Sequence, residues 1–213
     1  MATALDEDQQ TDDGPAIPWR SVVACLAAAL LGVGLGLFVT RDDPPSADSV
    51  DVRFLQDMRF HHEQAVGMAL VLVAKPRDGA GAGANATLRQ MAREIIQSQA
   101  FEGGRMAQML TQFRAAVANE GDTAMEWMGM PLPLNEMPGL ATDDETAELD
   151  AAQGAAADKV FIRLMIDHHK GGIHMAEYAA AHARTETVRT FARVLTHDQQ
   201  DEIDEMQALA AKL

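Results

Sequence analysis

The stretch Phe54-Leu55-Gln56-Asp57-Met58-Arg59-Phe60-His61-His62 returns 107 residues later as Phe161-Ile162-Arg163-Leu164-Met165-Ile166-Asp167-His168-His169. Each copy continues to a Met-Ala pair at the same spacing, Met68-Ala69 and Met175-Ala176. Imidazole nitrogen and thioether sulfur are neutral ligands that suit copper. The repeated M-x-x-H-H-x(5)-M-A pattern therefore predicts two related helices that face each other, and it makes their shared histidines and methionines candidate metal ligands.

The repeated residues all fall on one face of a helix. Positions i, i+3, i+4, i+7, i+10 and i+11 share a helical face. In the first copy that face carries Met58, His61, His62, Ala65, Met68 and Ala69, and in the second it carries Met165, His168, His169, Gly172, Met175 and Ala176. The small residue at i+7 would let a neighbouring backbone come close. The predicted metal ligands are therefore Met58, His61, His62, Met68, Met165, His168, His169 and Met175.

The same stripe is also compatible with an ordinary hydrophobic core. Methionine at helical spacing usually serves packing. Burying an imidazole costs roughly 1–3 kcal/mol unless it is hydrogen-bonded, and this chain would do so four times in two copies. Metal binding is the favoured interpretation of the His-His pairs, and structural hydrogen bonding is the alternative.

A second repeat supports the first. Gln99, Glu102 and Met106 recur 100 residues later as Gln199, Glu202 and Met206, and Thr87-Leu88-Arg89 recurs as Thr187-Val188-Arg189. The whole region is therefore interpreted as a duplicated helical hairpin. Glu102 and Glu202 could accept hydrogen bonds from imidazole N–H groups beside a metal, or they could be solvated charges.

Helical periodicity and breaker residues predict the remaining elements. We expect helices over residues 49–74, 85–119, 155–182 and 185–212, and a short helix opened by the capping box Thr142-Asp143-Asp144-Glu145. Gly103-Gly104 is a predicted weak point, and residues 78–84 form a predicted flexible loop. Two short hairpins and one long crossover fit a ferritin-like bundle. The predicted fold class is all-α, a ferritin-like four-helix bundle from a duplicated helical hairpin, preceded by one transmembrane helix.

The predicted crossover, residues 120–142, is rich in methionine. It carries Met125, Met128, Met130 and Met137 together with Trp127. These thioethers could supply extra soft ligands. The favoured interpretation is that a long loop covers the end of the bundle and uses methionine as adaptable filler.

The motifs resemble the domain of unknown function 305 family. Two M-x-x-H-H-x(5)-M-A helices, each followed by a Q-x-x-E-x-x-x-M helix, match its pattern over about residues 48–213, and Met137-Pro138-Gly139-Leu140-Ala141-Thr142 is similar to its lead-in to the second motif. The resemblance implies a ferritin-like four-helix fold in secreted or membrane-anchored bacterial proteins. It also implies copper binding as one function, since some relatives are described as copper-binding proteins that aid copper resistance.

The N-terminal part of the chain differs from the rest. Residues 21–39 form an apolar run long enough for one membrane span, and Trp19 before it suits a membrane interface. The acidic start is a poor signal-peptide n-region and no clear cleavage site follows, so an uncleaved signal anchor is favoured over a cleaved signal peptide. The predicted parts are an acidic tail (1–18), a transmembrane anchor or signal segment (19–40), a linker (41–50) and the four-helix domain (51–213).

Composition narrows the function. The net charge of −15 argues against nucleic acid as a partner. Di-iron bundles use a Glu-x-x-His pair on each of two helices, and the sequence contains no Glu-x-x-His, so no enzyme activity is predicted.

We expect a membrane-anchored, extracytoplasmic protein that binds copper as Cu(I) or Cu(II) for sequestration, delivery or tolerance. The alternative is a non-catalytic interaction or pH-sensing module in which the His/Met stripe is structural.

Overall fold

A computed structural model describes residues 23, 26, 28, 43–76 and 85–213 of the chain. The chain divides into two compact units, Met1–Asp43 and Pro44–Leu213, and the second unit carries both repeats. Apart from positions 23, 26 and 28, the predicted tail and anchor lie outside the described residues, as does the predicted loop at 78–84. Among the helices of the described part, none is both long enough and apolar enough to span a membrane.

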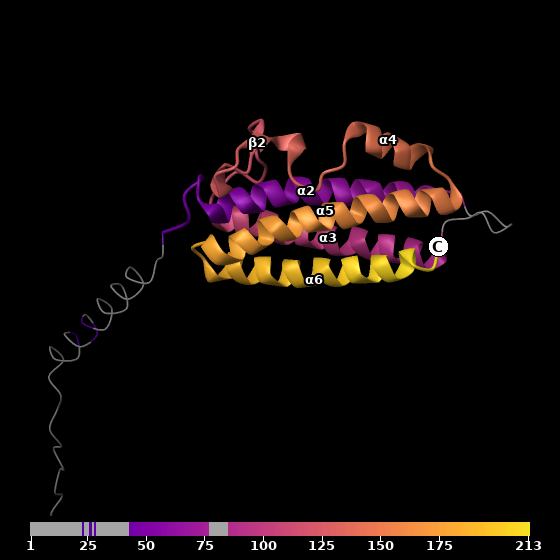
Figure 1. Cartoon of the computed structure of the whole chain (residues 1–213). Helices are drawn as coiled ribbons and strands as arrows, with labels where there is room; N and C mark the ends of the chain where they lie inside the picture. The colour runs from indigo at the N-terminus through magenta and orange to yellow at the C-terminus, as the bar shows by residue number, and fades with distance from the viewer. Residues whose placement is uncertain (1–22, 24–25, 27, 29–42, 77–84) are drawn as a thin grey trace, which may run out of the picture. The chain divides into compact units, whose positions relative to one another are not determined.

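Helices dominate the second unit, and the all-α prediction is confirmed. Four long helices, α2 (Val50–Ala74), α3 (Ala86–Gln112), α5 (Gly154–His182) and α6 (Glu186–Ala210), accompany the shorter α4 (Asp143–Ala151). Figure 1 shows the long helices side by side, with α4 and the connection before it lying over α2 and α5. The packed pairs are α2 with α3, α5 with α6, and α2 with α5, as expected for two hairpins joined along α2 and α5.

The second predicted helix is shorter than expected. It was predicted to reach residue 119, but α3 ends at Gln112 because Arg114 adopts a positive φ of 58°. The amide of Ala115 then donates back to the Leu110 carbonyl, which closes the last turn. The predicted weak point at Gly103-Gly104 does not interrupt α3.

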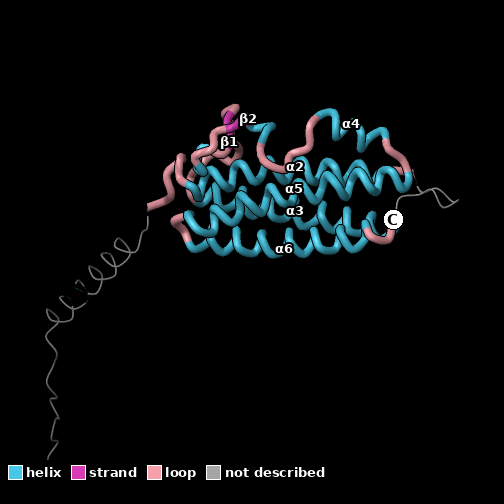
Figure 2. The backbone as a smooth tube through the Cα atoms, in the orientation of Figure 1, coloured by secondary structure: helices cyan, strands magenta, loops and turns pink. Residues whose placement is uncertain are grey.

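The crossover contains short elements that periodicity did not predict. Strands β1 (Thr123–Ala124) and β2 (Leu132–Pro133) pair antiparallel, and the 3-10 turns η1 (Glu126–Met128) and η2 (Leu134–Glu136) follow them in turn. Figure 2 shows this small sheet above one end of the helices. Met125 and Met137 are fully buried in the core below it, whereas Met130 is exposed. Their burial supports the packing interpretation for these two methionines.

Two buried aspartates join the hairpins. Asp51 in the first turn of α2 accepts hydrogen bonds from the backbone amides of Arg184 and Thr185, just before α6. Asp158 in the first turn of α5 accepts one from the amide of Asn85, just before α3. Each helix that carries a motif therefore begins where the other ends, so α2 and α5 run antiparallel. The two aspartates are 107 residues apart, the same offset as the histidine motif.

Candidate metal centre

The two motif stripes meet in the middle of the α2–α5 contact. The rings of His61 and His168 lie with their centroids 3.8 Å apart at an interplanar angle of 38°. Both side chains are fully buried, and His62 and His169 are at most 2% exposed. The antiparallel crossing of α2 and α5 thus gathers the four motif histidines, which we call the histidine layer, inside the domain.

Each of these histidines uses Nε2 to donate a hydrogen bond. His61 donates to the carbonyl oxygen of Pro138 at 3.1 Å, and His168 donates to the carbonyl oxygen of His61 at 2.9 Å. His62 pairs with Glu102 at 2.8 Å, and His169 pairs with Glu202 at 2.5 Å. Of the two interpretations of the repeated glutamates, the one as imidazole partners is therefore confirmed.

The remaining ring nitrogens are unpaired. Carbonyl and carboxylate oxygens only accept, so Nε2 carries the proton and the neutral ring keeps a lone pair on Nδ1. The Nδ1 atoms of His61, His62, His168 and His169 are all buried without a hydrogen-bond partner. A lone pair held in this way, with the opposite nitrogen oriented by a carbonyl or carboxylate, is the usual state of a metal-binding histidine. The four rings therefore have the protonation state and the orientation that metal binding requires of a histidine.

Burial keeps the innermost rings neutral. It lowers the pKa of His61 to about 3, helped by the neighbouring His62, although the Pro138 carbonyl opposes the shift. Burial likewise holds the pKa of His168 well below its ordinary value, with further lowering from His61, His169 and His62. Neutral imidazole is the form that binds metals.

Methionines of the two copies lie in two separate clusters of the core. Met58 and Met175 share one cluster with Met106, and Met68 and Met165 share the other with Met206. The antiparallel crossing explains the pairing, because the start of one stripe meets the end of the other. Met106 and Met206 were not among the predicted ligands, although their repeat and helical spacing were visible in the sequence.

Carboxylates and histidines alone do not make a metal cage here. Among the described residues, no group of three or more His, Cys, Asp or Glu side chains could hold an ion. A metal at this place would therefore combine imidazole with other ligands, and thioether sulfur is the chemistry that the adjoining clusters offer.

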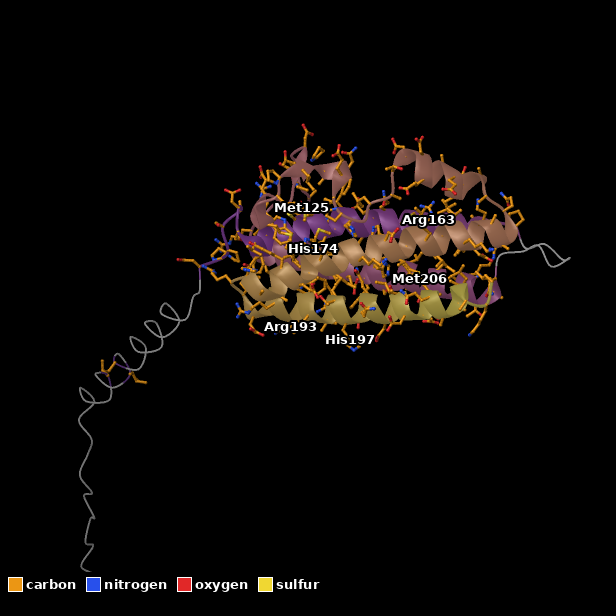
Figure 3. The ribbon with its side chains drawn as sticks, in the orientation of Figure 1. Met125, Arg163, His174, Arg193, His197 and Met206 are labelled. Atoms are coloured by element: carbon orange, nitrogen blue, oxygen red, sulfur yellow. The ribbon has the colours of Figure 1, made fainter. Side chains whose placement is uncertain are left out.

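The histidines outside the two motifs lie on the surface. His174, His182 and His197 are exposed, and Figure 3 places His197 on the outer side of α6. The Nδ1 atom of His197 lies 3.3 Å from a carboxylate oxygen of Asp201. The ring of His182 stacks on that of Tyr178, with the ring centroids 4.0 Å apart. None of the three joins the histidine layer.

Acid is expected to destabilise the metal-free domain through the histidine layer. A histidine in the unfolded chain has a pKa near 6.5, whereas burial lowers the pKa of His61 in the folded protein to about 3. Between these two pH values the unfolded chain binds a proton that the folded protein does not bind, which favours unfolding. The free energy of unfolding should be highest above pH 6.5. Between pH 6.5 and about pH 3 it should fall by up to about 1.4 kcal/mol per pH unit for each such histidine. Urea unfolding with a chelator, at a series of pH values, measures the slope. His61→Gln should reduce it, and the exposed His174→Gln should not.

Three comparisons place the chain among known proteins. A solved DUF305 protein of Streptomyces coelicolor, proposed to be secreted, is 34% identical, with a TM-score of 0.69 over 78% of this chain and 95% of that chain. A DUF305 fragment from Deinococcus radiodurans is 26% identical, with a TM-score of 0.65 over 80% of this chain and 99% of that chain. The Cu(I)-bound form of CopM is 25% identical, with a TM-score of 0.54 over 76% of this chain and 96% of that chain.

The comparison with curated proteins gives no match. The family described as Domain of unknown function (DUF305) matches residues 51–210, which include both histidine motifs and all four long helices almost in full. The chain belongs to the DUF305 family.

Proposed function

We propose that this protein binds copper in the histidine layer, with imidazole nitrogen and thioether sulfur as ligands. The observation that carries the proposal is that all four motif histidines hold a buried, unpaired Nδ1. Neutral imidazole binds both Cu(I) and Cu(II), and thioether sulfur favours Cu(I). The similarity to CopM, solved with Cu(I), supports the same cargo.

The arrangement favours two equivalent sites. Met58 and Met68 are ten residues apart on α2, about 15 Å along the helix, so one ion cannot reach both. The two methionine clusters divide the stripes accordingly, with Met58 and Met175 on one side of the histidine layer and Met68 and Met165 on the other. Each site would draw on one methionine cluster and on the histidines next to it.

The proposed role is sequestration, delivery or tolerance of copper outside the cytoplasmic membrane, without catalysis. A ferritin-like bundle of the four long helices would be the scaffold, anchored by residues 19–40 or secreted after their removal. The only cysteine of the chain, Cys25, precedes the four-helix domain. A His/Met site in that domain therefore contains no thiol that could be oxidised to a disulfide outside the cytoplasm. The Streptomyces coelicolor relative, proposed to be secreted, supports this location.

A structural role for the histidine layer is the competing proposal. Its specific support is that every motif histidine already makes one hydrogen bond through Nε2. A helical interaction or pH-sensing module would need nothing more from these residues. The two proposals differ in what removal of the imidazoles does to copper binding.

Replacing His61, His62, His168 and His169 together by alanine should lower the apparent Cu(I) affinity by at least about 100-fold, because the only nitrogen ligands of the layer are lost. Anaerobic titration against a chromophoric Cu(I) chelator measures the affinity, and circular dichroism checks the helices. The matched control replaces the three exposed histidines, His174, His182 and His197, and should bind like the parent. Parent-like binding by the quadruple variant would make the layer structural.

A second variant guards against loss of folding. Met58, Met106 and Met175 replaced by leucine keep their volume, which usually costs less than about 1.5 kcal/mol per site. This variant should lose Cu(I) affinity more than Cu(II) affinity, because only thioether sulfur is removed. Unchanged Cu(I) affinity would exclude this cluster as a source of ligands.

A further inference from the structure

A pocket on the first hairpin leads to the histidine layer. It lies between α2 and α3, has a volume of about 330 Å³ and is lined by His62, Gln99, Gly103 and Gly104 among others. At roughly 30 Å³ for each water molecule, it has room for about ten waters. A small hydrated cation therefore fits inside it.

The lining carries unpaired polar atoms. His62 and Gln99 are each only 2% exposed, so both lie at the inner side of the pocket. The Nδ1 of His62 and both amide atoms of Gln99 have no hydrogen-bond partner. Unpaired buried polar atoms are costly unless water or a ligand satisfies them. The inner wall thus offers an imidazole lone pair and an amide oxygen to whatever occupies the pocket. The charges of the lining are paired, because Glu63, which is 70% exposed, lies 3.9 Å from the guanidinium of Arg59.

Two glycines leave the pocket open. Gly103 and Gly104 lie inside α3, where each costs the helix roughly 1 kcal/mol relative to alanine. No neighbouring atom lies within 4 Å of a Cβ built on either, and neither has a positive φ, so neither close packing nor backbone shape explains them. In the second hairpin the position equivalent to Gly103 is Ile203, which is 3% exposed and part of the core. The two hairpins therefore differ at the place where the pocket opens.

The opposite side of the layer is covered. A Cβ on Gly171 of α5 would lie 1.9 Å from the carbonyl oxygen of Pro138, so the segment around Pro138 rests directly on the helix. The same carbonyl accepts the hydrogen bond of His61. This contact covers His61 from the side of α5.

We propose that the α2–α3 pocket is the route by which copper ions reach and leave the histidine layer, with His62 as the first imidazole they meet. The proposal rests on the proposed function and adds to it the path by which the ion enters and leaves. Gly103 keeps the route open on the first hairpin, and Ile203 closes the equivalent position on the second. The amide oxygen of Gln99 replaces part of the hydration of the ion as it passes, and the proton-bearing Nε2 of His62 stays on Glu102.

Gly103→Ile gives the first hairpin the residue of the second and should fill the route. In full-length protein carrying Trp19→Phe, quenching of Trp127 by Cu(II) in stopped flow reports binding, and an added chelator reports release. Both rates should fall by about tenfold or more while the equilibrium affinity stays within about twofold, because a blocked route slows both directions equally. Gly67→Ile on α2 is the control, since Gly67 is exposed, has no atom within 4 Å of its Cβ and does not line the pocket. It should leave both rates unchanged.

A metal-free measurement separates the route from the copper site. Hydrogen–deuterium exchange at the imidazole C2 carbon, read by mass spectrometry, should slow at His62 in Gly103→Ile and stay unchanged at His168. Unchanged copper rates in a folded Gly103→Ile variant overturn the route, and so does an affinity loss as large as the rate loss. If the parent binds no copper, the proposed function fails and the route with it. The exchange result still tells in that case whether the pocket carries water to His62.

Discussion

Replacing Gly171 by alanine is expected to push the segment around Pro138 off α5 and to destabilise the domain strongly. The new Cβ would lie 1.9 Å from the carbonyl oxygen and 2.4 Å from the carbonyl carbon of Pro138, and 2.8 Å from the amide nitrogen of Gly139. All three are backbone atoms, so no side-chain rotation relieves the overlap. The segment must move as a whole, and its hydrogen bonds move with it.

Three of those hydrogen bonds join the segment to α2. His61 donates to the Pro138 carbonyl, and the side-chain amide of Gln64 both donates to and accepts from the backbone of Ala141, at 2.8 and 2.7 Å. At about 1 kcal/mol for each bond, their loss lowers the free energy of unfolding by on the order of 3 kcal/mol. For a domain of this size the melting temperature should fall by about 6–12 °C.

Gly67→Ala is the matched control for this prediction. Gly67 lies on α2 with nothing within 4 Å of its Cβ, so alanine there should stabilise the helix by up to about 1 kcal/mol. Thermal and urea unfolding of both variants measure the contrast. A Gly171→Ala variant as stable as the parent would mean that the segment yields without loss, and that it does not hold His61 in place.

Periodicity and repetition were sufficient to predict the four long helices, apart from the end of α3, and the meeting of the histidines. Two copies of one stripe on two packed helices bring His61 and His168 together in any duplicated hairpin, and the repeated glutamates follow from the same symmetry. The Asp51 and Asp158 pair carried the same 107-residue offset, so it could have been found in the sequence. Met106 and Met206 were visible in the same way.

The asymmetric features could not be predicted, because they depend on contacts between distant parts of the chain. The Pro138 carbonyl accepts the hydrogen bond of His61 across 77 residues, whereas the equivalent histidine of the second copy, His168, donates to the carbonyl oxygen of His61. The sequence alone does not distinguish Gly171 from Gly103, because both are glycines within predicted helices. In the structure, one is required by a backbone in contact with it and the other leaves open space. That difference arises from tertiary packing, about which helical periodicity gives no information.

Replacing Asp57 by alanine is the second large effect that we expect. Asp57 is fully buried on α2. One carboxylate oxygen accepts from the side-chain amide of Asn119 at 2.9 Å, and the other accepts from the backbone amide of Met125 at 2.9 Å and the indole N–H of Trp127 at 2.8 Å. A single side chain therefore ties the crossover to α2 at three points, including Met125 at its positive φ of 65°.

Alanine at position 57 leaves the Met125 amide and the Trp127 indole N–H without an acceptor, and it leaves the Asn119 side-chain amide with only the carbonyl oxygen of Thr123. An unsatisfied buried donor costs about 1–3 kcal/mol, so the free energy of unfolding should fall by on the order of 4 kcal/mol. Trp127, which packs edge to face on Phe54 and Tyr178, should gain exposure, and its fluorescence should shift to the red below the main unfolding transition. Asp48→Ala is the control, because Asp48 is 87% exposed and only pairs with Arg53 at the surface, where a lost pair costs about 1 kcal/mol at most. Equal stability of the two variants would show that water replaces the carboxylate, and that the crossover is held by its buried methionines and Trp127 alone.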